Sequence, residues 1–165
     1  MPRIYVGTYK KYTEGSIKGA WLDLEDYDSH DDFMQACRTL HKDEYDPEFM
    51  FQDHEGIPDQ FITECSLEPE FWDYMNSGVV EDVKEAYMEL FDAWDEETCN
   101  SGYIGQFDNP TRMAEYLLDE TGFFYNIPES VRDKVELYFN FQAYARDMQY
   151  NGEYKEHNGH YFWSN

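Results

Sequence analysis

The first 60 residues alternate between hydrophobic and polar positions as strands do, with one helical stretch among them. Residues 3–8 and 17–24 alternate with a period of two, which predicts two strands joined by a connection that bears Gly, Lys and Ser. Residues 29–41 begin with a serine suited to capping and repeat hydrophobic side chains at spacings of three and four, which predicts a helix. A short strand is predicted at 49–52, before a Gly and a Pro break the chain. We therefore expect a small α+β domain over residues 1–60.

The middle of the chain has helical periodicity. Residues 68–70 suit the first turn of a helix that Gly78 ends, and a second helix is predicted over 80–94. One face of this second helix is hydrophobic, with Val80, Val83, Tyr87, Leu90, Phe91 and Trp94. Another face is acidic, with Glu81, Glu85, Glu89, Asp92 and Glu96. Like charges four residues apart cost an isolated helix about 0.2–0.5 kcal/mol per pair, so the acidic face points to a function. We expect an acidic helical domain over 61–103.

The last third mixes both periodicities and predicts a second α+β domain over 104–165. A strand is predicted at 103–107, and a helix at 110–120 with Met113, Tyr116 and Leu117 facing inward. Another helix begins near Pro128 and runs through Val131, Val135, Leu137 and Tyr138. Each of the two Asn-Gly pairs, at 151–152 and 158–159, predicts a β-hairpin between aromatic flanks.

The formal charge of −24 is unevenly distributed over the 165 residues. Residues 1–42 carry a net −1, residues 43–111 a net −19 with Lys84 as their one base, and residues 112–165 a net −4. So acidic a chain is repelled by nucleic-acid phosphates and anionic lipids and attracted to basic clefts. Aliphatic side chains are few, but 12 Phe, 15 Tyr and 4 Trp residues supply enough surface for a core. The sequence predicts a folded protein that binds a basic protein surface, and neither nucleic acid nor membrane.

Residue types that carry catalysis or bind metals do not occur in recognisable spacings. The three cysteines lack a C-x-x-C spacing, which disfavours a disulfide framework and a thiolate zinc site and suits the reducing cytosol. The acidic run at 23–32 lacks the glycine of an EF-hand loop, and His157 and His160 read as polar residues of a hairpin. No nucleophile or phosphate-binding motif is present, although 36 acids leave a carboxylate-using hydrolase as an alternative. We expect no metal, no cofactor and no enzymatic activity.

The size of the charge fits an imitation of duplex DNA. A duplex carries one charge per about 1.7 Å of axis, so 24 charges correspond to about 12 base pairs. Two alternatives stay open, namely a solvated or halophilic surface and an acidic chaperone that sequesters basic DNA-binding proteins. The uneven charge and the many aromatic residues favour a dedicated surface that mimics DNA. Its candidate carboxylates are Glu64, Glu68, Glu70, Asp73, Glu81, Asp82, Glu85, Glu89, Asp92, Asp95, Glu96 and Glu97.

Both ends of the chain resemble the ArdA antirestriction proteins. The stretch over residues 3–24, with RIYVGTY at its start and WLDL at its end, is similar to the opening of that family. Residues 141–148, FQAYARDM, resemble its YxAYxRDL-type antirestriction motif, with Met148 in place of the Leu. The motif residues present are Phe141, Ala143, Tyr144, Arg146, Asp147 and Met148.

The resemblance implies an antirestriction protein of three small domains that forms elongated homodimers. Members are carried by plasmids and conjugative transposons, and they inhibit type I restriction-modification enzymes by binding in place of DNA. By position, the acidic surface would face the methyltransferase core of such an enzyme, and residues 141–148 would lie near the dimer contact. Taken alone, the residues give this segment a simpler interpretation, as the apolar side of a helix. Without a secretion leader or a long apolar run, we expect a protein of the bacterial cytoplasm.

Overall fold

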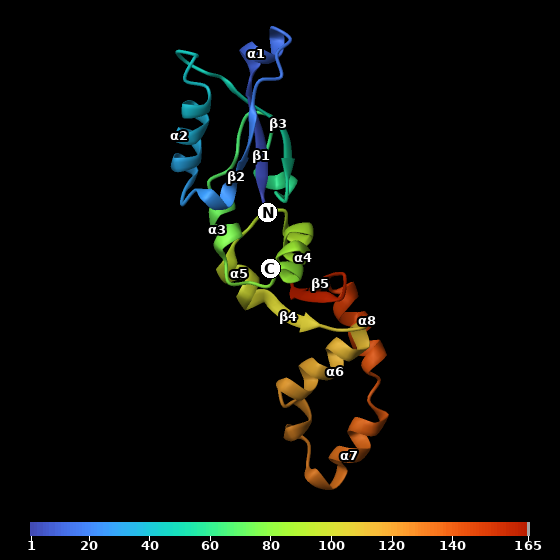
Figure 1. Ribbon diagram of the computed structural model, residues 1–165. Coiled ribbons are helices and arrows are strands. Elements are labelled where there is room, and N and C mark those ends of the chain that lie inside the picture. The colour runs from blue at the N-terminus through green and yellow to red at the C-terminus, as the bar shows by residue number, and fades with distance from the viewer. Residues whose placement is uncertain (165) are drawn as a thin grey trace. The chain divides into compact units, whose positions relative to one another are not determined.

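The computed structural model describes residues 1–164 and is α+β, as the sequence predicts. The chain forms two compact units, Met1–Ser77 and a second that begins at Gly78. Each unit contains one three-stranded antiparallel sheet (Figure 1). Residues 61–77 belong to the first unit and residues 78–103 to the second. The division into three domains, over 1–60, 61–103 and 104–165, stays a prediction.

The sheet of the first unit has β1 (Arg3–Thr8) at its centre, between β2 (Ala20–Asp23) and β3 (Phe49–Glu55). Ile4 and Val6 of the central strand are fully buried, because alternate residues of a strand point to the same face of the sheet. The predicted strands are thus present, although the second is shorter and the third longer than the sequence pattern suggests.

Helix α2 (His30–Leu40) and a group of aromatic rings complete the core of this unit. Ser29 caps α2 as predicted, since its hydroxyl accepts a hydrogen bond from the N–H of Asp32 at 3.3 Å, and Phe33 and Cys37 are buried. The other helices are short: α1 (Tyr9–Thr13), η1 (Leu24–Asp26), η2 (Asp59–Phe61) and α3 (Phe71–Asn76). The buried rings are Phe33, Phe51, Phe61, Phe71, Trp72 and Tyr74.

The sheet of the second unit has β6 (His160–Trp163) between β4 (Tyr103–Gln106) and β5 (Tyr154–His157). Asn158 and Gly159 join β5 to β6 with φ angles of 50° and 82°. Both residues therefore lie in the left-handed region that a tight Asn-Gly turn requires, so the hairpin predicted at 158–159 is confirmed.

Helices α4 (Glu81–Phe91) and α5 (Glu96–Gly102) form the first part of this unit. Tyr87 and Phe91 of α4 contact Phe162 of β6, with ring centroids 5.6 and 6.0 Å apart. The buried cluster that results consists of Ala86, Tyr87, Cys99 and Phe162.

Helices α6 (Pro110–Glu120) and α8 (Phe141–Tyr150) pack on each other in the second part of the unit (Figure 1). Between them the chain forms η3 (Phe123–Asn126) and α7 (Glu129–Tyr138). The shared core of α6, α8 and the sheet consists of Met113, Met148, Tyr154 and Tyr161. No residue of α7 is buried.

The helix predicted over 80–94 is shorter than expected. It ends at Phe91 because Asp92 adopts a left-handed conformation with φ of 56°. Val80 precedes the helix and is 68% exposed, so its place on the hydrophobic stripe was wrong.

Three further expectations about the elements were also wrong. Asn151-Gly152 closes α8 and starts no hairpin: the N–H of Gly152 donates to Gln149 O at 3.0 Å. Tyr116, expected to face inward, is 42% exposed. The connection at 10–18 contains most of α1, a helix that the sequence pattern did not indicate.

Candidate protein-interaction surface

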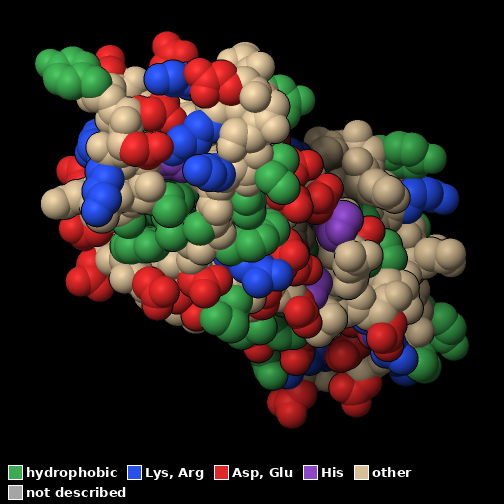
Figure 2. All heavy atoms as spheres, turned by 45° about the horizontal axis from the view of Figure 1, so that its top comes forward, with side chains coloured by type: hydrophobic (Ala, Val, Ile, Leu, Met, Phe, Trp, Pro, Cys, Tyr) green, Lys and Arg blue, Asp and Glu red, His purple; other side chains and the backbone are tan. Residues whose placement is uncertain are grey.

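All twelve candidate carboxylate residues are exposed. Four of them, Glu64, Glu68, Glu70 and Asp73, belong to the first unit, and the other eight belong to the second. On the face drawn in Figure 2, acidic side chains are interspersed with hydrophobic and basic ones. The candidates are thus available to a partner, but they come from several elements in two units.

The acidic face of α4 is shorter than the sequence suggests. Glu81, Glu85 and Glu89 follow one another at steps of four on the helix, which gives a row of about 12 Å at 1.5 Å per residue. Asp92 lies at the helix end and Glu96 on the next helix, so neither continues this row.

Lys84 makes the row less uniformly negative than it appears in the sequence. Its Nζ lies 2.7 Å from Oε2 of Glu81, and the lysine side chain is 6% exposed whereas that of Glu81 is 60% exposed. Part of the charge of Glu81 is therefore balanced within the chain. Glu85 and Glu89 are the clearer candidates for contact with a basic partner.

The acids at the start of α5 have a local structural role. The carboxylate of Asp95 caps the helix by accepting from the N–H of Thr98 at 2.6 Å, and hydrogen bonds from Thr98 lower the pKa of Asp95. Glu96 accepts from the N–H of Gly78 at 3.3 Å. Negative side chains stabilise the positive end of a helix dipole, so capping accounts for these acids as well as a partner would.

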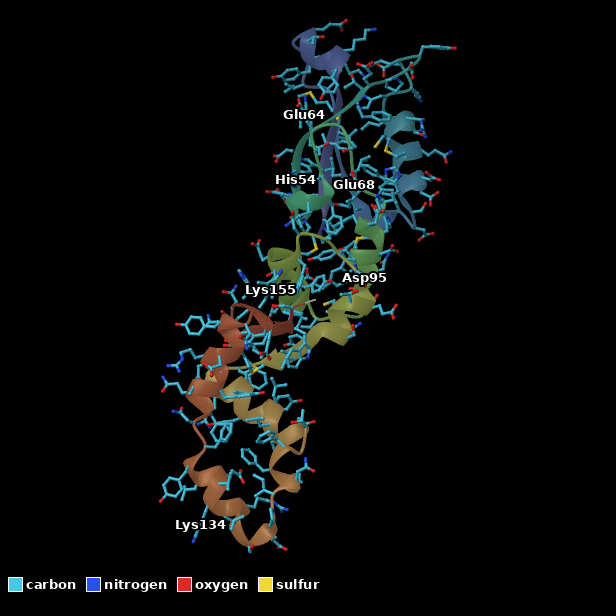
Figure 3. The ribbon with its side chains drawn as sticks, turned by 180° about the vertical axis from the view of Figure 1, so that it is seen from behind. His54, Glu64, Glu68, Asp95, Lys134 and Lys155 are labelled. Atoms are coloured by element: carbon cyan, nitrogen blue, oxygen red, sulfur yellow. The ribbon has the colours of Figure 1, made fainter. Side chains whose placement is uncertain are left out.

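The four candidate acids of the first unit lie on α3 and on the segment before it. Glu64 and Glu68, labelled in Figure 3, hold their backbone in place through main-chain hydrogen bonds. The N–H of Phe51 donates to Glu64 O at 2.7 Å, and the N–H of Glu68 donates to Phe61 O at 2.8 Å. Because these bonds use the main chain, the two carboxylates extend from a fixed backbone.

The segment 141–148 forms most of α8, and its hydrophobic side packs inside the unit. Ala145 and Met148 are buried, and Phe141 contacts the ring of Phe139 at a centroid distance of 4.9 Å. The side chains of Arg146 and Asp147 are 61% and 69% exposed. Ala143 and Tyr144 are half-buried. The structure thus shows the apolar helix side that the residues predict, and the dimer contact stays a prediction.

Exposed hydrophobic side chains lie on α7 and on η3 before it, and the sequence pattern did not indicate their exposure. The helix is amphipathic, which predicts a buried face, but its hydrophobic residues are exposed in the single chain. The exposed side chains are Phe123 and Tyr125 of η3 and Val131, Val135, Leu137 and Tyr138 of α7. The signal in the sequence that could have indicated this surface is the adjacent pair Leu137 and Tyr138 at a helix end.

The histidine and cysteine side chains that could bind a metal or act as nucleophiles lie in surroundings that suit a structural role. Within residues 1–164, no three His, Cys, Asp or Glu side chains converge as a metal site would require. His160 is buried, and its Nδ1 lies 2.9 Å from the hydroxyl of Tyr103, which corrects its interpretation as a polar hairpin residue. Burial raises the pKa of the Cys37 thiol to about 12 and that of Cys99 to about 11. Neither thiol is therefore activated as a nucleophile.

Comparison with protein families covers almost the whole chain. The family model described as antirestriction protein (ArdA) matches residues 4–162. The match covers most of both units and the whole segment 141–148. The comparison with curated proteins gave no match. Among the described residues, every helix is too short or too polar to cross a membrane.

Proposed function

This chain belongs to the ArdA antirestriction family, and on that premise we propose that it inhibits type I restriction-modification enzymes by occupying their DNA-binding groove in place of a duplex. The methyltransferase core of the enzyme is the proposed partner. In this proposal the chain acts as an inhibitor and catalyses no reaction itself.

The observation that supports this mechanism most strongly is the exposure of all twelve candidate carboxylates. Each structural unit has 18 Asp and Glu residues against 6 Lys and Arg residues, a net charge of −12. A groove that gains affinity from phosphates does so largely by releasing counterions. Two units that each carry a net −12 offer such a groove the same gain in affinity, although they contain no nucleotide.

The mimicry does not depend on one continuous row of acids. On α4 the row ends after Glu89, and the remaining candidates lie at the ends of α4 and α5, on α3 and on the segment before α3. We infer that the phosphate pattern is imitated by short groups of carboxylates on separate elements.

A homodimer is the second part of the proposal. The exposed hydrophobic side chains of η3 and α7 support it, because isolated chains rarely expose a hydrophobic patch of several large residues. We infer that a second copy covers this surface, with α7 of each copy at the contact. The segment 141–148 then contacts the chain next to this surface, since the ring of Phe141 packs against that of Phe139, which directly follows α7.

The test is competition for a methyltransferase core bound to a labelled duplex at about 0.15 M salt. Wild-type protein should displace the duplex near stoichiometry. The variant E85K/E89K/E97K should need at least about tenfold more protein, because each reversal replaces an attraction by a repulsion.

The matched control is D28K/D46K/E48K, which changes three exposed acids outside the candidate surface by the same total charge. It should lose much less potency. Equal losses in both variants would mean that only net charge matters, as for an acidic chaperone. Failure of the wild type to displace the duplex would reject DNA mimicry.

A further inference from the structure

A groove of about 830 Å³ runs along α6 and α8 in the second unit. Its walls come from the first half of α6 and from nearly the whole of α8. The lining includes Arg112 and Arg146 and one acid, Glu115. In a chain of net charge −24, a lining with two bases to one acid is unusual, and DNA mimicry does not account for these arginines.

Both arginines keep hydrogen-bond donors for a ligand. Arg112 Nη1 donates to Glu115 Oε2 at 2.6 Å, which uses one of the five N–H groups of the guanidinium. Arg146 Nε lies 3.8 Å from Asp147 Oδ1, too far for a direct hydrogen bond. Their side chains are 67% and 61% exposed, so the guanidinium groups are accessible from solvent. Such groups bind carboxylates through paired hydrogen bonds.

Side-chain amides line the same groove. Asn109 and Asn140 cap α6 and α8, and their Oδ1 atoms accept from backbone N–H groups at 3.1 and 2.9 Å. Each also carries an NH₂ group, and Gln142 and Gln149 add two further amides. An amide side chain offers a donor and an acceptor, which are the groups that a peptide backbone needs.

The length of the groove suits a short peptide. The α8 wall extends from residue 140 to residue 149, which corresponds to about 14 Å at 1.5 Å per residue. An extended chain covers that distance in about four residues at 3.3 Å each. The volume also lies within the 300–1,000 Å³ that is usual for binding pockets, near its upper end.

We propose that this groove binds an extended acidic peptide segment of the target restriction enzyme. Arg112 and Arg146 bind its carboxylates, and the amides bind its backbone. The inference rests on the proposed function and adds to it a contact that duplex DNA cannot make, because phosphates would repel an acidic segment. Each arginine has a carboxylate beside it, Glu115 for Arg112 and Asp147 for Arg146, so the ligand binds the guanidinium N–H groups that these acids leave unused.

The test measures direct binding of labelled protein to the DNA-free methyltransferase core. The variant R112E/R146E is compared with R38E/K42E, which reverses two exposed bases of the first unit. Both variants become more acidic by the same amount. General attraction to a basic groove therefore predicts tighter binding for both, whereas the α6–α8 groove predicts at least tenfold weaker binding for R112E/R146E alone.

Two further measurements distinguish a peptide-binding groove from a misfolded variant and from a contact between copies. The neutral pair R112Q/R146Q and R38Q/K42Q repeats the comparison, and circular dichroism shows whether each variant is folded. Weaker binding by folded R112Q/R146Q, with an unchanged dimer in light scattering, supports the groove. Equal binding by both variants, or loss of the dimer in R112Q/R146Q, overturns the proposal, the latter because the groove would then be a contact between copies.

Duplex displacement is recorded in parallel with direct binding. Wild-type protein that binds the core without displacing DNA would reject mimicry while the comparison of the variants still tests the groove. Wild-type protein that does not bind the core overturns both proposals.

Discussion

At the scale of single residues, the clearest arrangement that the sequence pattern did not indicate is a polar cluster beside β1. Lys11 Nζ lies 2.9 Å from His41 Nδ1, 2.8 Å from Asp43 and 3.3 Å from Glu44. Because an ammonium group only donates, Nδ1 of His41 accepts, and its Nε2 carries the proton and donates to Val6 O at 3.1 Å. His41, predicted only as a helix end, therefore anchors α2 to the sheet.

Glu44 of this cluster should determine part of the acid stability of the first unit. A hydrogen bond from the hydroxyl of Thr8 and the neighbouring Lys11 lower the pKa of Glu44 below its usual value. In the unfolded chain the carboxylate binds a proton at higher pH, so the stabilisation is present above the usual Glu pKa of about 4.3. It is lost as the pH falls through the lowered value in the folded protein.

We therefore expect the melting temperature of E44Q to fall less steeply than that of the wild type between pH 6 and pH 3. The measurement is thermal unfolding at each pH, with the exposed Glu48 replaced in the control E48Q. Differences between variants are informative here because protonation of the many other acids relieves repulsion and acts in the opposite direction. Parallel curves for wild type and E44Q would contradict the prediction.

At the scale of elements, the two Asn-Gly pairs show how context selects among local preferences. The pair at 158–159 makes a hairpin, whereas the pair at 151–152 ends α8, where Glu153 N–H donates to Met148 O at 3.0 Å. Glycine is favoured both in tight hairpin turns and after the last residue of a helix. The dipeptide therefore predicts a left-handed residue in both places, and only the preceding helix decides which element it closes.

The hydrophobic spacing that predicted too long a helix for α4 also reflects the packing around it. Trp94 lies three residues beyond the end of the helix, yet its ring meets Tyr87 at a centroid distance of 5.8 Å. The residue packs on the same cluster from non-helical backbone. Hydrophobic spacing therefore predicts which side chains are buried together more reliably than it predicts where the helix ends.

Helix α7 should be the element that joins two copies. Leu137 and Tyr138 are 76% and 83% exposed, so the variant L137E/Y138E should fold and yet dissociate at least tenfold more readily. Burying a carboxylate at a subunit contact is costly, which gives the expected direction. Light scattering over a concentration series measures the change.

The control for α7 is I17E/Y45E, which places the same charges at exposed hydrophobic positions of the first unit. Its dimer should resemble that of the wild type. An unchanged dimer in L137E/Y138E would place the contact elsewhere.

At the scale of the whole molecule, the charge is divided evenly although it is uneven along the sequence. The net −19 of residues 43–111 is shared between the units, and each unit carries −12. Each core must therefore form against repulsion among the carboxylates of its own unit. Salt screens such repulsion, and it also weakens binding that depends on counterion release.

Salt should therefore change stability and inhibition in opposite directions. Between 0.05 and 0.5 M NaCl we expect the melting temperature to rise by several degrees and the concentration needed to displace the duplex to increase at least tenfold. Thermal unfolding and duplex displacement in the same buffers measure the two effects. A melting temperature that falls or stays constant would show that repulsion does not limit stability.

The sequence by itself determined where several helices and strands of this protein lie. Alternation placed β1, spacing and a serine cap placed α2, and the helix predicted at 110–120 matches α6. The net charge and the segment 141–148 pointed to the family that the match over residues 4–162 shows. These features depend on neighbours along the chain, and such neighbours are visible in a sequence.

Only the tertiary structure decided which side chains lie in contact and which stay exposed. It joined Lys11 to His41 and Glu44, left α7 without a buried residue and placed Arg112 and Arg146 along one groove. It also divided a single acidic tract between two units. Each of these outcomes depends on contacts between residues far apart in the chain, whose energies no local pattern contains.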